Sequence, residues 1–236
     1  AGTGVAAAVA VNVLLLDNRA SIGPGVSVSA GGAVTVDATA DYNALTEAIG
    51  NAFDLQSDTG VGAGVGFLWA DTSNTAAIGG GANVTGASVA VRADRPGNAG
   101  EHEFRTWAFA AGGGKDTGFG GSVAVNVVAI DTSATIGSGA GITASGGNIE
   151  VVADQRTAVQ TVAGAAGVSN GGTGVGASVG LNVVTNNTQA VVGAGAVLRA
   201  SEDVDVTADS AVLPINVDLP DPLTSITVSN LAISGG

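Results

Sequence analysis

The chain of 236 residues contains no cysteine, which excludes disulfide bridges and thiolate metal sites together. It also lacks methionine, so we expect a processed product or a piece of a longer chain. Aromatic residues make up only 3%, which excludes a core built on large rings. Seven lysines and arginines stand against 20 acidic residues, for a net charge of −13. Without a basic patch, nucleic acid is not an expected partner.

Long hydrophobic runs are absent as well. The longest, "VAAAVAVNVLLL" from Val5 to Leu16, is too short to cross a bilayer as a helix, and Asn12 interrupts it. No signal peptide is visible. The sequence therefore predicts no membrane span.

Glycine is abundant, with 39 residues, and it marks an internal repeat. A Thr-Gly pair begins each of four copies, at Thr3, Thr59, Thr117 and Thr173, which lie 56, 58 and 56 residues apart. Nineteen residues after each threonine, an isoleucine or valine is followed by glycine. Fixed spacing of this kind indicates a repeat architecture, in which each unit buries its apolar face against the next.

Each copy opens with a segment that alternates in period two. In the fourth copy, Val175 and every second residue to Val183 form an apolar face, while Gly176 and its alternates are very small. We expect another sheet to pack closely on the small face, with a flat ligand-binding face as the alternative. The valine columns are expected to point inward, and Trp69 with them.

Two shorter strands follow the Ile-Gly pair in each copy, and the chain then turns back through a glycine-rich loop. We expect an antiparallel hairpin to join consecutive copies. The predicted fold is all-β, a β-solenoid (β-helix-like) of four 56–58-residue repeats with long hairpins between coils, over residues 1–213. Residues 214–236 are expected to form a proline-containing C-terminal tail with a terminal strand.

The succession of "AVAVNV", "A-x-IG-x-GA" and "V-x-V-x-A" resembles the repeats of giant bacterial surface proteins, the filamentous-haemagglutinin and leukotoxin-type filamentous adhesins. The resemblance covers about residues 3 to 213 and implies a secreted, extracellular β-helical rod at the cell surface, with no ligand specified. The expected function is a structural module, either a stiff adhesin stalk or a self-associating filament subunit. Its expected partners are itself, head to tail, or neighbouring repeats of a longer chain, with a host or matrix surface as a further candidate.

The only histidine lies in "EHEFRTW", residues 101–107. On a strand Glu101, Glu103 and Arg105 share one face while His102 points to the other, so these groups do not converge. A solvated strand in which Arg105 pairs with the glutamates is favoured over a metal or catalytic site. We therefore expect no enzyme and assign no catalytic residue. The alternative is a polysaccharide-binding or polysaccharide-cleaving β-helix, for which Trp107 is the candidate stacking platform.

Carboxylates form two columns when the copies are aligned. Asp94, Asp154 and Asp209 share one column, and Glu150 and Asp205 share another. With coils ~4.8 Å apart these like charges would repel. Calcium could relieve the repulsion, and so could solvent and salt. The five residues are thus a candidate calcium site, and no other cofactor is expected; a merely acidic surface is favoured because the G-G-x-G-x-D motif of calcium-binding β-rolls is missing.

The tail departs from the repeat. Three prolines within residues 214–222 predict an extended connector, after which Ile226, Val228 and Leu231 offer a fresh strand. We expect this strand to pair with an exposed edge of the next molecule and to join chains head to tail. Coverage of both ends by neighbouring repeats of one longer polypeptide is the alternative.

Overall fold

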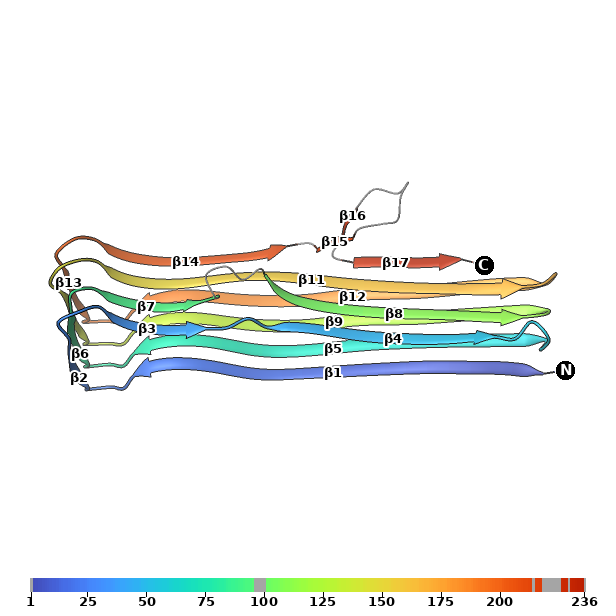
Figure 1. Cartoon of the computed structure of the whole chain (residues 1–236), viewed down its shortest axis with the longest axis horizontal. Helices are drawn as coiled ribbons and strands as arrows, with labels where there is room; N and C mark the ends of the chain where they lie inside the picture. The colour runs from blue at the N-terminus through green and yellow to red at the C-terminus, as the bar shows by residue number, and fades with distance from the viewer. Residues whose placement is uncertain (1, 96–100, 214, 218–225, 229, 236) are drawn as a thin grey trace.

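The chain winds four times along the same path and builds a β-solenoid (Figure 1). The structure, a computed structural model, describes residues 2–95, 101–213, 215–217, 226–228 and 230–235. Over that part of the chain there are strands and turns but no helix. Each coil crosses a long sheet, a short sheet and a return sheet in turn. The all-β solenoid predicted from the repeat is confirmed.

The long sheet consists of the first strand of each coil, and all its strands run parallel. Twenty residues of each strand pair with the next without a gap, so that Thr3, Thr59 and Thr117 begin one continuous ladder that Thr173 completes. The fixed spacing of the copies is therefore the register of the sheet. Its strands, in order, are β1 (Thr3–Ile22), β5 (Thr59–Ile78), β9 (Thr117–Ile136) and β12 (Thr173–Val192).

The short sheet lies at one end of the molecule, where each coil turns. The turn before it contains Gly25, Gly81, Gly139 or Gly195, with φ of 68°, 68°, 69° and 72°. These left-handed values favour glycine and explain the second glycine of each "IG-x-G" segment. The strands of the short sheet are β2 (Ser27–Ser29), β6 (Asn83–Gly86), β10 (Gly141–Ala144) and β13 (Val197–Ala200).

The return sheet carries each coil back, and it is parallel too. It is broken into two strands in the first two coils, continuous in the third and completed by the tail in the fourth. Its strands are β3 (Val34–Thr39) and β4 (Asn43–Phe53), β7 (Val89–Asp94) and β8 (His102–Gly114), β11 (Ile149–Ser169), then β14 (Val204–Leu213) and β17 (Asn230–Gly235).

The reversal between coils is not the antiparallel hairpin that the turn residues predict. Strand β4 hydrogen-bonds to β8 of the next coil, and it packs face to face on β1 and β5 of the long sheet. The chain thus makes an arch between two sheets. The reason is that each strand finds a near-identical parallel partner in the next coil, while its small inner face is covered only when the sheets stack.

The inner face of the long sheet is the small-residue face, and the return sheet packs closely on it. A Cβ placed at Gly62 would lie 2.2 Å from the carbonyl oxygen of Ala111 in the return sheet, and one at Gly60 equally close to that of Gly113. Towards the short sheet the core becomes thicker, and fully buried Ile78, Ile136 and other aliphatic side chains fill it. Close packing by another sheet is confirmed.

The valine columns, in contrast, point outward. The exposed fraction is 70% for Val5 and Val9, 57% for Val179 and 43% for Trp69. The expectation that Trp69 lies on an inward column is therefore wrong. On the inner face, carbonyl oxygens of the return sheet lie so close to the glycines that no larger side chain fits. Because side chains alternate between the two faces of a strand, the larger side chains lie on the outside.

The fourth coil leaves its inner face open. Val204 and Val206 of β14 are 44% and 43% exposed, whereas their partners Ile149 and Val151 in β11 are 0% exposed. The return sheet is offset, so that β11 lies over both β9 and β12 while β14 overhangs beyond β12. A fifth long strand would cover this overhang.

The tail strand pairs with its own chain. Leu231 lies in β17 opposite Val162 of β11, in a parallel ladder. Ile226 and Val228 lie in β16 (Ile226–Val228), which pairs antiparallel with β15 (Ile215–Val217). These backbone pairings need no second molecule, and exchange of the tail between molecules stays a prediction.

Close sheet contact predicts a sharp difference between two glycines of the long sheet. We expect Gly62→Ala to lower the free energy of unfolding by at least about 2 kcal/mol, because its methyl group would overlap a backbone carbonyl that cannot move away. Gly121 lies on the outer face, where a Cβ meets nothing within 4 Å. We expect Gly121→Ala to change stability by less than about 0.5 kcal/mol or to increase it slightly. Urea titration of both variants measures this, and equal effects would contradict the packing.

Candidate functional site

The acidic columns lie on the outer side of the return sheet, in the register expected from the sequence. Asp154 pairs with Asp209, and Glu150 pairs with Asp205. Asp94 follows directly after Ala93, which pairs with Ala153, so that it takes the place next to Asp154. The structure therefore brings the five carboxylates onto neighbouring strands of one face.

Arginines already compensate part of this charge. Arg95 lies 3.1 Å from a carboxylate oxygen of Asp154, and Arg156 reaches the other oxygen at 4.0 Å. Arg92 forms an ion pair with Glu150. The sequence analysis named calcium, solvent and salt as means of reducing the repulsion between these carboxylates. It missed the arginines, although Arg92 and Arg95 lie close to Asp94 in the sequence. Among the described residues, no three His, Asp or Glu side chains gather as a metal ion would need.

Asp94 keeps an unfavourable environment despite the arginines. Burial raises the pKa of its carboxyl above the usual range, and the nearby charge of Asp37 raises it further. Thr39 donates a weak hydrogen bond of 3.4 Å, which acts in the opposite direction. The carboxyl of Asp94 therefore binds its proton more tightly in the folded protein than in the unfolded chain. Ionised Asp94 lowers the free energy of unfolding, and this loss disappears when acidification protonates the carboxyl.

The column predicts a weak, non-specific response to divalent cations. We expect calcium to raise the melting temperature no more than magnesium does at equal ionic strength, because arginines occupy Asp154 and Glu150. Asp154→Asn together with Asp209→Asn should remove any calcium-specific excess. Thermal melts with both cations test this. A large, saturable stabilisation at micromolar calcium would instead establish a specific site at the five carboxylates.

The sole histidine is part of the core. His102 is 1% exposed, its ring stacks on Tyr42 at 5.0 Å, and its Nδ1 accepts a hydrogen bond of 2.9 Å from the Tyr42 backbone N–H. Burial lowers the pKa of His102, although Asp41 opposes the shift. Glu103 lies on the opposite face and pairs with Arg105 at 2.8 Å. The separation predicted for this segment is confirmed.

Burial of neutral His102 predicts a loss of stability on acidification. Below the unfolded-state pKa of about 6.5 the unfolded chain binds a proton that the folded chain refuses, so stability falls as the pH drops from about 7 towards 5. We expect His102→Asn, which keeps an acceptor for the Tyr42 N–H, to be less stable at pH 7 but flatter over this range. Urea midpoints at a series of pH values measure the difference. Parallel curves for the two proteins would contradict a depressed pKa.

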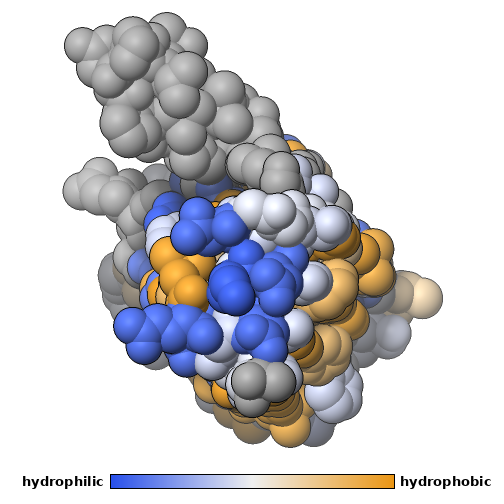
Figure 2. All heavy atoms as spheres, turned by 90° about the vertical axis from the view of Figure 1, so that its right-hand side faces the viewer, coloured by the Kyte–Doolittle hydropathy of each residue, from blue (hydrophilic) through white to orange (hydrophobic). Residues whose placement is uncertain are grey.

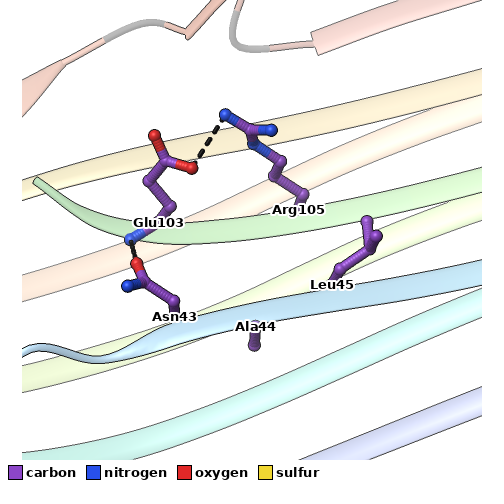
Figure 3. A pocket seen from close by; sticks show the side chains of 5 residues that line it. All are labelled: Asn43, Ala44, Leu45, Glu103 and Arg105. Carbon is purple, nitrogen blue, oxygen red and sulfur yellow. Dashed lines mark hydrogen bonds and ion pairs between the residues drawn. The ribbon is translucent and has the colours of Figure 1, made fainter.

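A shallow hollow lies beside this segment on the outer side of the return sheet (Figure 3). Asn43, Ala44 and Leu45 of β4 line it together with Glu103 and Arg105 of β8. The Asn43 amide oxygen accepts a hydrogen bond of 2.9 Å from the Glu103 backbone N–H. Its lining holds a single carboxylate, and Arg105 neutralises it, so the hollow offers no pair of carboxylates for acid–base work on a glycosidic bond.

A second hollow lies on the outer side of the long sheet, and sequence reasoning missed it. Leu15, Leu16, Asp17, Asp71 and Ser73 line it, and the Ser73 hydroxyl donates a hydrogen bond of 2.6 Å to Asp17. The signal was available, because aspartates replace valines at the end of the alternating segment in copies one to three. The hollow marks the boundary at which the outer face changes from apolar to polar.

A further surface feature is the apolar part of the long sheet, where valines and other large apolar side chains are exposed on the outer side. Figure 2, which looks along the strands, shows hydrophobic residues gathered along the right-hand side of the molecule.

No family model matches this chain, and neither a curated protein nor a solved structure does. No helix in the described part of the chain is long and apolar enough to cross a membrane.

Proposed function

We propose that the chain is a non-catalytic structural module of a secreted bacterial surface protein, and that it works by associating through its sheets. The observation that carries the proposal is the unbroken 20-residue register shared by four coils, which ends in an open coil with Val204 and Val206 exposed. The resemblance of the repeats to filamentous adhesins supports an extracellular location at the cell surface.

The dimensions favour association over a role as a spacer. Four coils add only about 19 Å along the stacking direction, since each strand takes ~4.8 Å. A 20-residue strand, in contrast, extends about 66 Å at ~3.3 Å per residue. The long axis of the molecule therefore follows the strands, as Figure 1 shows. A repeat of more than 50 residues gains little reach but adds a wide strip of flat sheet, so the self-associating role is preferred to the stalk.

The two ends of the stack are complementary. At one end β14 overhangs β12, and at the other β1 stands beyond the return sheet. A further strand with the sequence pattern of β1 would pair in parallel with β12 and cover Val204 and Val206. The same pairing would serve a second copy, head to tail, or a further repeat of one chain. A host or matrix surface then meets the flat sides of the stack.

Stacking predicts that charges on the overhang block growth. We expect Val204→Lys with Val206→Lys to abolish end-to-end assembly, because two lysines would be buried without partners in the next coil. Both positions are exposed in the single molecule, so its own stability should hardly change. Sedimentation velocity and electron microscopy at high protein concentration measure the assemblies.

Thr207→Lys is the matched control, since Thr207 lies on the same strand but pairs beside Val152, on the outer side. This variant should assemble as the unmodified chain does. Single particles for every protein at every concentration would refute stacking of separate copies. Assemblies that survive the two lysines would show that the overhang is not the contact.

A further inference from the structure

The outer side of the long sheet carries an apolar surface that stacking leaves uncovered. It comprises five successive columns of the ladder, which we name the valine face. Every position in these columns is apolar. The columns are Val5, Val61, Phe119, Val175; Ala7, Ala63, Gly121, Ala177; Val9, Val65, Val123, Val179; Val11, Phe67, Val125, Leu181; and Val13, Trp69, Val127, Val183.

The valine face is free of charge in a chain whose net charge is −13. The outer side of the return sheet differs, because it carries the charged residues Glu103, Arg105, Glu150 and Asp154 beside exposed apolar ones such as Ile49. Two copies of such an acidic chain repel each other in most orientations. The orientation in which two valine faces meet keeps the acidic residues of the return sheets farthest apart, at the two outer surfaces of the pair.

The size of the face suits pairing with its own copy. Nine residues along each strand at ~3.3 Å and four strands at ~4.8 Å give a footprint of about 570 Å². Two copies would then cover about 1,100 Å², above the ~1,000 Å² that a specific interface requires. A single apolar patch of this size is at the upper end of what monomers leave exposed, roughly 300–600 Å².

We propose that the valine face pairs with the valine face of a second copy, and that the two long sheets form a sandwich across a two-fold axis. This proposal rests on the structural role proposed above and adds a second interface to it. An axis along the stacking direction would leave the ends of both copies pointing the same way, so that paired stacks can grow together. Columns of valine on two flat sheets interdigitate as in other face-to-face sheets.

Other occupants fit less well. A polysaccharide could stack on Trp69, Phe67 and Phe119, but the five columns offer no polar side chain to bind its hydroxyl groups. An anionic lipid surface would repel a chain of this charge. The valine face of a second copy avoids both difficulties, because it has no hydroxyl groups to bind and no charge at the contact.

The test uses the full chain with Val204→Lys and Val206→Lys, in which only face-to-face pairing remains. We expect sedimentation equilibrium to give twice the chain mass of 22.3 kDa. Adding Val9→Glu and Val179→Glu should weaken the dimer at least about 30-fold, because each carboxylate would be desolvated without a partner. The two sites are 70% and 57% exposed and lie on opposite edge strands, so the monomer should keep its fold.

Ile49→Glu is the control, since Ile49 is 50% exposed on the outer side of the return sheet. This variant should remain a dimer. A second readout uses Trp69, isolated by Trp107→Phe. Its fluorescence should be shielded from a soluble quencher in the dimer and should become accessible on dilution.

Each outcome decides the proposal. A monomer in the lysine background overturns face-to-face pairing, whether or not the unmodified chain stacks. A dimer that survives the glutamates, or that Ile49→Glu dissociates equally, overturns it too. The valine face is established as a separate interface by two results together. The glutamates dissociate the dimer while Ile49→Glu does not, and the chain with an unmodified overhang still stacks. If stacking fails and the dimer forms, the proposed growth of the stack is refuted and the pairing stands. A polysaccharide that shields Trp69 of the monomer would identify the other class of occupant.

Discussion

The close approach of two backbones is the constraint on which the rest of the structure depends. Along the glycine-rich part of the long sheet, carbonyl oxygens of the return sheet occupy the space where side chains would stand. Hydrophobic burial there involves small groups and many backbone contacts, so the gain per residue is small. Stability must then come from the ladders and from the thicker aliphatic core near the short sheet. A single coil has neither, which is why the unit of folding is the stack.

The same constraint decides what the surface looks like. A strand with glycine on one side and valine on the other would ordinarily turn the valine inward, but here valine does not fit between the sheets. The polar residues of the inner face follow the same logic, because the Asn126 amide donates to the Gln160 carbonyl at 2.8 Å and to the Asn182 amide oxygen at 3.0 Å. Asparagine thus joins both sheets and neighbouring coils where an aliphatic side chain would only fill space.

The repeat predicted the register, the coil and the acidic columns correctly, because spacing between identical copies maps directly onto pairing in a parallel solenoid. It could not decide which face of the strand is buried. Alternation with period two divides a strand into two faces but does not show which of them is buried. The rule that valines lie inside therefore placed Trp69 on the wrong side. The very small residues of the other face indicate which face is buried, because a face of glycine and alanine is typical of a strand that lies too close to another sheet for larger side chains to fit. The pairing of Arg95 with Asp154 was missed because the two residues lie on neighbouring strands and are 59 residues apart in the sequence.

Outward valines and an open overhang are two consequences of one arrangement, and they point in perpendicular directions. Stacking satisfies hydrogen bonds along the strand edges and buries the inner face of the last coil, but it cannot reduce the apolar area on the side of the long sheet. Each added coil extends that side by another strip of valine, so the exposed apolar area grows in proportion to the length of the stack. A longer stack therefore has a stronger drive to cover its side than a shorter one. Growth along the axis and pairing across the face are coupled through this area, and the coupling needs no change in conformation.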